Sequence, residues 1–410
     1  SNLRTLTKTI GHRLSGSPEA DRAMVWGADL LRLYGADSVF VMPVVVPSWT
    51  RGNVASAYVT LSNGEREELH ITALGGSIGT AGDSIITAGI IVVKQLTDLD
   101  SMEADFTKGK IVLFNRAMNP VLINTGSAYG GANDQRGRGA IAAARVGAIG
   151  ALVRSLTHSL DTLPHTGAMY YSEEVPRIPA AAISTVDARK LAALYKEDSN
   201  LRVSFIMNCT ALPDVEQGNV IGEWTGAEFP NEIITLGGHL DSWDIGEGAH
   251  DDGAGIVHTI EVLRALKAVG YTPRRTIRFV LFINEENGNR GGEKYAEIAA
   301  RELEAGENPW LGIEGNQEND NGNACPIDVD GEELRISFAM IYDEDGESGG
   351  VTGFSKDEEP GGGGLGIVAT QLLDSTYATT NVDLDSDGFV DLYPGDKLKM
   401  TDWHWFDWYN

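Results

Sequence analysis

The chain has 410 residues, with 59 Asp and Glu against 32 Lys and Arg, which gives a formal net charge of -27. This charge argues against a nucleic-acid partner and against an anionic membrane surface, because both attract basic faces. With 42% hydrophobic and 22% charged residues, the composition is that of a globular protein of about two to three domains. No apolar run approaches the roughly 18 residues that predict a membrane-spanning helix.

The predicted elements begin with a helix and two strands. Residues 3–35 carry an apolar pattern with helical spacing. Strand-like runs follow at 39–46 and 55–61. We expect residues 1–84 to form the N-terminal part of a larger domain.

From about residue 85 the pattern becomes that of a compact α/β unit, predicted over residues 85–209. Its expected elements are strands at 85–93, 110–114, 150–154 and 178–183 and helices at 139–146 and 186–195. The alternation resumes over residues 210–305, with strands at 219–223, 233–236 and 276–283 and helices at 254–269 and 292–304. This spacing predicts an α/β fold with a mostly parallel central sheet flanked by helices, plus the smaller α/β insert.

The last quarter of the chain differs in composition. Residues 301–410 hold 25 acidic and only 5 basic residues, together with glycine-rich stretches typical of loops. One interpretation is a solvated acidic surface. Another is calcium binding, for which the best candidates are alternating carboxylates near Gly388: Asp383, Asp385, Asp387 and Asp391. This run lacks the Glu that closes an EF-hand loop, so a plain Asp-rich turn is the competing interpretation.

A histidine and an aspartate follow the predicted strand 233–236. His239 comes directly after the strand, at the end where open α/β sheets place their ligand sites. Asp241 lies two residues further, so in extended backbone its carboxylate reaches the same face as the imidazole. There it can hold the second ring nitrogen of a metal-binding histidine.

Four more carboxylates are predicted close to His239. Asp251 and Asp252 lie between a glycine turn and the helix at 254–269, and Glu285 and Glu286 end the strand at 276–283. Each has an ordinary structural interpretation, since either Asp could cap the helix and the Glu pair could be a solvated turn. Likewise, His239 could be a hydrogen-bonded structural histidine. These structural interpretations are weaker for the residues taken together, because neighbouring carboxylates repel unless a cation or a proton offsets their charge.

At the level of motifs, residues 5–300 resemble the two-zinc aminopeptidase family. The motifs that carry the resemblance are Gly11-His-Arg-Leu-Ser-Gly-Ser17, Pro47-Ser-Trp-Thr-Arg-Gly52, Leu74-Gly-Gly-Ser-Ile-Gly-Thr80, Ala143-Ala-Arg-Val-Gly-Ala148, Pro164-His-Thr-Gly167 and Gly238-His-Leu-Asp-Ser-Trp-Asp-Ile-Gly246. The resemblance implies that residues 85–209 are an inserted protease-associated domain and that 210–305 are the metallopeptidase core. Residues 306–410 resemble no part of the family.

The resemblance also implies a role for each candidate residue. His239 and Glu286 each resemble a ligand of one zinc, and Asp251 resembles the carboxylate that bridges two zincs. Glu285 matches the general base, and Asp241 matches the residue that orients His239. The implied activity is that of a zinc-dependent exopeptidase, of dipeptidase, carboxypeptidase or aminopeptidase type, which hydrolyses short peptides with a metal-activated water. Family members are often homodimers, so a homodimer is expected here.

Two further family ligands have weak counterparts in this chain. An Asp is replaced by Asn316, with Asp320 as the nearest other carboxylate, and the late His corresponds to His404. Two functions therefore remain open: an active exopeptidase, or a non-catalytic extracellular protein that uses its acidic region for calcium-dependent assembly. An acidic, lysine-poor chain that does not begin with Met suits a secreted or periplasmic protein.

Overall fold

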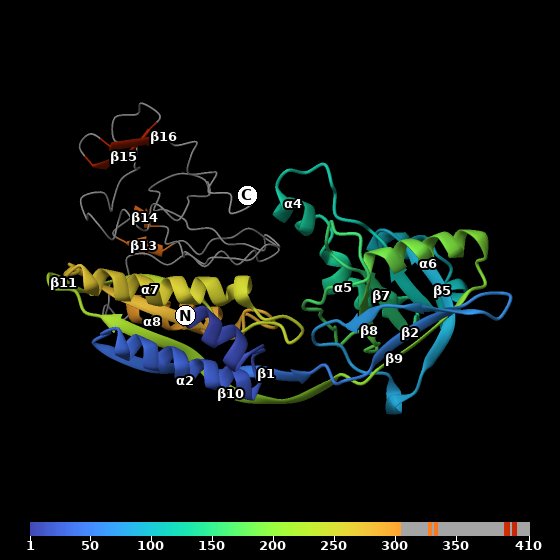
Figure 1. The fold of residues 1–410 in the computed structure, drawn as a ribbon. Helices are drawn as coiled ribbons and strands as arrows, with labels where there is room; N and C mark the ends of the chain where they lie inside the picture. Colours follow the sequence, from blue (N-terminus) through green and yellow to red (C-terminus); the bar gives the residue numbers. More distant parts are fainter. Residues whose placement is uncertain (305–326, 330–331, 335–388, 394–395, 400–410) are drawn as a thin grey trace. The chain divides into compact units, whose positions relative to one another are not determined.

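The computed structural model describes residues 1–304, 327–329, 332–334, 389–393 and 396–399 (Figure 1). Several candidates from the sequence lie outside these residues: Asn316, Asp320, His404, Asp383, Asp385 and Asp387. Asp391 lies in the short strand β15, where only the course of the backbone is described. None of the helices that the structure describes combines the length and the apolar character needed to cross a membrane.

Two compact units make up the chain. The first comprises residues 1–46, 216–242 and 246 onwards, and the second comprises residues 47–215 and 243–245. The insert expected over 85–209 falls wholly within the second unit, which also takes in residues 47–84. Its identity as a protease-associated domain stays a prediction.

The first unit is built around a four-stranded sheet with the strand order β1-β10-β12-β11. Its strands are β1 (Ser38–Thr50), β10 (Thr210–Trp224), β11 (Phe229–His239) and β12 (Arg275–Phe282). Its helices are α1 (Asn2–Arg4), η1 (Thr5–Ile10), α2 (Pro18–Leu33), η4 (Ala249–Ala254), α7 (Gly255–Ala268) and α8 (Arg290–Glu304) (Figure 1). Two short antiparallel hairpins follow, β13 (Ile327–Val329) with β14 (Glu332–Leu334) and β15 (Phe389–Tyr393) with β16 (Asp396–Lys399).

Among the described strands of the first unit, the sheet contains one parallel and one antiparallel pairing with β12. Strand β11 runs parallel to β12, whereas β10 runs antiparallel to β12. The connections explain the difference. Helix α7 lies between β11 and β12 in the chain, as a parallel crossover requires, but only residues 225–228 join β10 to β11, which is too short for a crossover.

Both faces of this sheet are covered, as the alternation along β12 shows. Phe279 and Leu281 belong to the apolar cluster that contains residues of α2 and α7. Val280 and Phe282 belong to another, with Tyr295 of α8. Because successive side chains of a strand point to opposite faces, β12 is buried on both, and its last four residues, Phe279 to Phe282, form a continuous apolar run. Its carboxyl end therefore emerges from the core where β11 also ends.

The second unit contains an eight-stranded sheet with the strand order β3-β2-β9-β5-β6-β7-β8-β4. The eight strands of this sheet are β2 (Ala55–Thr60), β3 (Arg66–Leu69), β4 (Ile71–Ala73), β5 (Ile86–Val93), β6 (Ile111–Phe114), β7 (Gly150–Arg154), β8 (Ala180–Ile183) and β9 (Arg202–Met207). Its helices are η2 (Ala81–Asp83), η3 (Leu96–Ser101), α3 (Ala104–Thr107), α4 (Thr125–Gly130), α5 (Asp134–Arg145) and α6 (Thr185–Glu197). The run β5-β6-β7-β8 is parallel, as its strand–helix alternation predicts.

A buried carboxylate joins α6 to the neighbouring strands of the second unit. Asp187 accepts hydrogen bonds from the backbone N–H of His70 at 2.8 Å and from the hydroxyl of Ser184 at 2.8 Å. It also pairs with Lys190 at 3.2 Å and with Nδ1 of His70 at 2.7 Å. Burial alone would raise the pKa of this carboxyl, but the hydrogen bonds outweigh burial and hold the pKa of Asp187 below its ordinary value.

Replacing Asp187 with alanine is expected to lower the free energy of unfolding by about 2 kcal/mol at pH 7, because buried donors lose their acceptor. A lowered pKa in the folded state stabilises the protein above the ordinary pKa of Asp, about 3.9. That stabilisation is lost as the pH falls through the lowered value. Urea unfolding at pH 7 and at pH 3 should therefore show the gap between wild type and variant closing at low pH. Asp100→Ala, at an exposed position, is the control, and an equal loss in both variants would contradict the assignment.

Candidate active site

The predicted site residues come together at the carboxyl ends of β11 and β12. His239 is the last residue of β11 and lies opposite Phe282, the last residue of β12. Glu285 and Glu286 follow β12 after a short connection, and Asp251 lies in the turn η4 that leads into α7. The structure thus places His239 and the Glu pair at the same edge of the sheet.

The imidazole of His239 is buried, with 1% of its surface exposed. Its Nδ1 lies 3.1 Å from the backbone oxygen of Asp241. A proton on Nδ1 that is donated to this carbonyl leaves the lone pair of Nε2 free. Nε2 is buried without a well-directed hydrogen bond, yet it lies 2.8 Å from Oδ1 of Asp251 and 3.9 Å from Oε2 of Glu285.

Asp241 contacts a different group from the one that the sequence suggests. Its carboxylate oxygen Oδ1 is 3.8 Å from Nδ1 of His239, which is too long for a hydrogen bond. Instead, Oδ1 accepts the backbone N–H of Glu285 at 3.1 Å and Oδ2 accepts that of Glu286 at 3.2 Å. The residue therefore holds the ring through its main chain and the Glu pair through its fully buried side chain.

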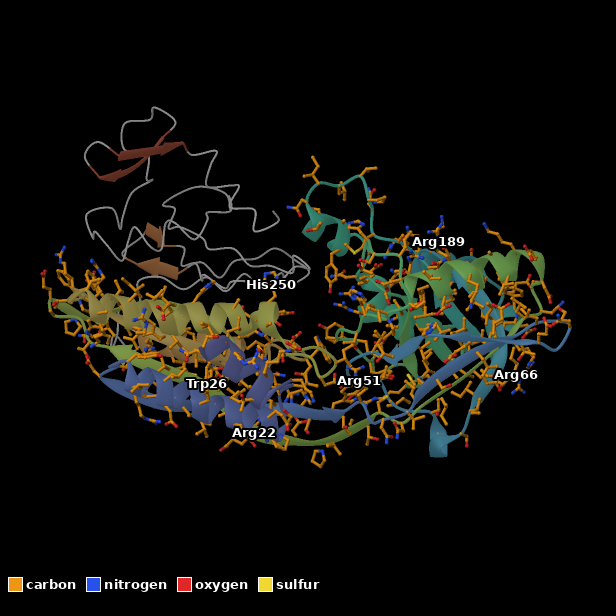
Figure 2. The ribbon with its side chains drawn as sticks, in the orientation of Figure 1. Arg22, Trp26, Arg51, Arg66, Arg189 and His250 are labelled. Atoms are coloured by element: carbon orange, nitrogen blue, oxygen red, sulfur yellow. The ribbon has the colours of Figure 1, made fainter. Side chains whose placement is uncertain are left out.

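The two adjacent aspartates have different surroundings. The carboxylate of Asp252 is fully buried, accepting the backbone N–H of His239 at 3.0 Å and that of Gly255 at 2.8 Å. The helix-capping interpretation thus describes Asp252, and burial raises its pKa to about 8. Asp251 has a side chain 30% exposed and directed at Nε2 of His239. The peptide bond between them is cis, and His250 precedes them beside the start of α7 (Figure 2).

The electrostatics of this cluster favour a cation. Burial and the negative charge of Asp251 raise the pKa of Glu286 well above its ordinary value. Burial disfavours the charged form of His239, but the charges of Glu285 and Asp251 outweigh it and raise the pKa of the imidazole. The cluster thus holds more negative charge than it can keep without extra protons or a metal ion.

The donor set is chemically suited to zinc. A buried imidazole nitrogen that has no well-directed hydrogen bond and faces carboxylate oxygens matches the nitrogen and oxygen ligands of Zn²⁺. Over the described part of the chain, however, no group of three or more His, Cys, Asp or Glu side chains is arranged so that it could hold a metal ion. The structure brings His239 together with Asp251 and Glu285, and places Glu286 close enough for its charge to couple to theirs.

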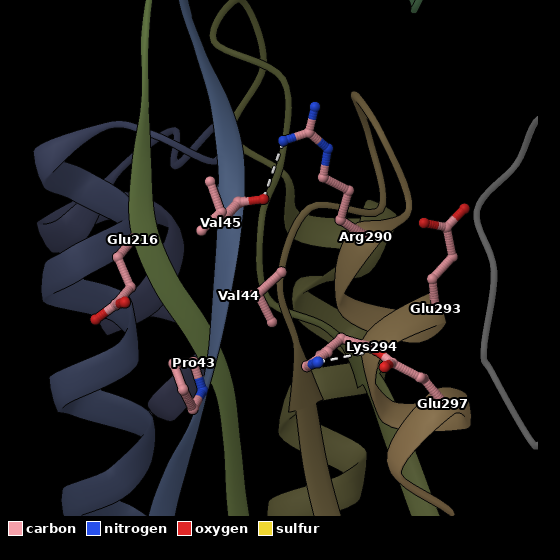
Figure 3. Close-up of a pocket in the computed structure, with 8 residues that line it drawn as sticks. All are labelled: Pro43, Val44, Val45, Glu216, Arg290, Glu293, Lys294 and Glu297. Atoms are coloured by element: carbon pink, nitrogen blue, oxygen red, sulfur yellow. Dashed lines mark hydrogen bonds and ion pairs between the residues drawn. The ribbon is translucent and has the colours of Figure 1, made fainter. Parts of the chain in front are cut away.

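A surface pocket lies elsewhere in the first unit, between β1 and α8 (Figure 3). Arg290 of α8 donates to the backbone oxygen of Val45 at 3.0 Å there, and Lys294 pairs with Glu297 at 2.8 Å. None of the candidate site residues lines this pocket.

Two residues near the site were missed by the sequence analysis. Arg13 and Ser15 lie in the segment between η1 and α2, more than two hundred residues before the loops that they contact. The one signal in the sequence was their place in the motif Gly11–Ser17, which carries part of the family resemblance but no carboxylate or other expected ligand.

The sequence of this chain is similar to those of known proteins. A sequence profile of peptidase family M28 matches residues 219–308. Carboxypeptidase Q of Xenopus laevis is 36% identical over 301 residues, which are 73% of this chain and 61% of that protein. The chain thus spans less than two thirds of the length of this relative.

Solved structures extend the match to the fold. The crystal structure of a peptidase M28 precursor from Shewanella amazonensis SB2B is 38% identical, with a TM-score of 0.69, covering 74% of this chain and 67% of that one. A zinc aminopeptidase from Bacillus subtilis is 21% identical, with a TM-score of 0.50, and the match covers 72% of this chain and 63% of that one. At this identity the similarity shows a common fold and nothing more. The identity to the M28 precursor, over two thirds of its length, confirms the expected family: the chain belongs to peptidase family M28.

Proposed function

We propose that the protein is a zinc-dependent exopeptidase that hydrolyses short peptides with a metal-activated water. The observation that carries this proposal is the buried Nε2 of His239, which faces the carboxylates of Asp251 and Glu285 at the ends of two parallel strands. A structural histidine would have its ring nitrogens satisfied by hydrogen bonds. An imidazole directed at two acidic groups instead suits metal binding.

In this proposal His239, Asp251 and Glu286 would hold the metal, at two zinc ions per chain. Bound zinc would lower the pKa of a water molecule toward about 7 and polarise the scissile carbonyl. Asp241 keeps the Glu pair in place through the backbone N–H groups of Glu285 and Glu286.

Glu285 is the proposed general base. Its carboxylate is partly exposed, at 22%, and lies 3.9 Å from Nε2 of His239, so it stands beside the proposed metal position and within reach of solvent. It would take a proton from the attacking water and deliver it to the leaving amine. A carboxylate retained there favours an enzyme over a non-catalytic scaffold, which has no use for a base.

The remaining expectations are part of the same proposal. They are a substrate with a free terminus, a homodimer, and a secreted or periplasmic location. Calcium binding by the acidic C-terminal quarter is a separate expectation that the same metal analysis tests.

The decisive experiment is elemental analysis of zinc and calcium in the purified protein, beside a Glu286→Ala variant and a dipeptide hydrolysis assay. We expect two zinc ions per wild-type chain and one or none in the variant, because a ligand is lost. Glu293→Ala, at an exposed position on α8, should keep both the metal and the activity. Absence of zinc from the active wild type would overturn the proposal.

A further inference from the structure

The segment from Gly11 to Ser17 contacts both loops that carry the proposed site. It connects η1 to α2 and has no regular secondary structure of its own. One of the two loops, residues 240–248, runs from His239 toward Asp251. The other, the turn 284–289, carries Glu285 and Glu286.

Arg13 holds the loop 240–248 at both of its ends. Its fully buried guanidinium donates from Nε to the backbone oxygen of Leu240, from Nη1 to that of Glu247 at 3.2 Å and from Nη2 to that of Gly248 at 2.9 Å. Its own backbone N–H donates to the hydroxyl of Ser242 at 3.3 Å. One planar side chain therefore sets the separation between the part of the loop that follows His239 and the part that precedes η4.

The fit around Arg13 is close. Gly248 has a φ of +55°, and a Cβ atom there would lie 2.7 Å from Nη1 of Arg13 and 2.3 Å from Cβ of Ser242. A side chain at this position would therefore displace the guanidinium or the loop. The charge of Arg13 also interacts favourably with the carboxylates of Asp241 and Asp252, although burial lowers its pKa.

Ser15 holds the turn 284–289 in a similar way. Its hydroxyl accepts a hydrogen bond from Nδ2 of Asn284 at 2.7 Å and donates one to Oδ1 of Asn287. Asn284 is fully buried, has a φ of +67° and directly precedes Glu285. Its Oδ1 accepts the backbone N–H of Arg290 at 3.2 Å, so the turn is tied to the start of α8 as well.

The segment itself is anchored. The backbone N–H of Gly16 donates to Oε1 of Gln217 at 2.8 Å, and Nε2 of Gln217 donates to Asp21 at 2.8 Å. The hydroxyl of Ser17 caps α2 by accepting the N–H of Ala20 at 3.2 Å. Because the segment is fixed to β10 and α2, it can hold both loops in a constant position relative to the sheet.

We propose that Arg13 and Ser15 are positioning residues for the exopeptidase: Arg13 sets the place of Asp251 relative to His239, and Ser15 sets the place of Glu285 and Glu286. This inference rests on the proposed function. Catalytic groups need placement to within about 0.5 Å, and a misplacement of about 1 Å can lower the rate about 100-fold. Loops tied to one common segment meet this requirement.

The test uses the full chain with Arg13→Lys, Arg13→Ala and Ser15→Ala, and with Arg22→Lys and Arg22→Ala as controls. Arg22 lies on α2 (Figure 2). Its exposed side chain pairs with Glu19. Lysine keeps the charge at position 13 but carries it on one nitrogen, so it cannot bridge three carbonyls. We expect Arg13→Lys to lower kcat about 100-fold with KM nearly unchanged and to weaken zinc affinity about tenfold in a chelator competition. Added guanidinium should restore part of the activity of Arg13→Ala. It should not raise the activity of Arg22→Ala.

Ser15→Ala should lower kcat about tenfold and speed hydrogen exchange at the amides of Glu285 and Glu286. Wild-type kcat, zinc affinity and exchange rates in both Arg13→Lys and Ser15→Ala would overturn the inference. If the wild type binds no zinc and cleaves no peptide, the proposed function fails by itself. Amide exchange in the loop 240–248 then decides the role of Arg13, since unchanged exchange in Arg13→Lys overturns it and faster exchange supports it.

Discussion

Replacing Glu285 with glutamine is expected to lower kcat for peptide hydrolysis by about 1,000-fold while leaving the zinc content unchanged. The amide is nearly the same size as the carboxylate but cannot accept the proton of the attacking water. The backbone N–H of Glu285 still donates to Asp241, so the turn keeps its place. The loss should therefore fall on the chemical step, with KM changed little.

Steady-state kinetics on a dipeptide, together with zinc analysis of the same samples, provide the measurement. Glu293→Gln on α8 is the matched control, because it makes the same chemical change at an exposed position. A Glu285→Gln variant that retains more than a third of the wild-type kcat at full zinc loading would exclude Glu285 as the base. A variant that also loses zinc would instead assign Glu285 to metal binding.

Asp251→Asn is expected to weaken zinc binding by at least about 100-fold and to reduce hydrolysis to background, because a neutral amide is a poor zinc ligand. Asp251 provides the carboxylate nearest to Nε2 of His239, at 2.8 Å. The variant also has one fewer negative charge beside Glu286, whose pKa the charge of Asp251 raises. Without zinc, its Tm should therefore equal or exceed that of the wild type.

The stability measurement separates metal binding from folding. Zinc at about 100 times the wild-type Kd should stabilise the wild type by about 2.7 kcal/mol, seen as a rise in Tm, and the variant by no more than about 0.4 kcal/mol. Asp29→Asn, which removes an exposed ion pair on α2, should respond to zinc like the wild type. An equal rise in Tm for Asp251→Asn and wild type would show that Asp251 is not a ligand.

Most elements were predictable because their apolar periodicity is strong. The strand predicted at 150–154 is β7 (Gly150–Arg154), and the helix predicted at 254–269 is α7 (Gly255–Ala268). The strand predicted at 219–223 proved to be only the last third of β10 (Thr210–Trp224). Its first seven residues, Thr210 to Glu216, are all exposed and mix apolar and polar types without alternation, so only pairing with neighbouring strands reveals them.

The sequence by itself determined the family and the set of acidic residues around His239, because strand ends and motifs are local features of the chain. Only the tertiary structure decided which atoms meet. It turned the carboxylate of Asp241 toward the backbone of Glu285 and Glu286, separated the capping role of Asp252 from the partly exposed position of Asp251, and brought Arg13 to the loop 240–248. Such contacts join residues far apart in the chain, and their geometry depends on side-chain direction and burial, which no local pattern encodes.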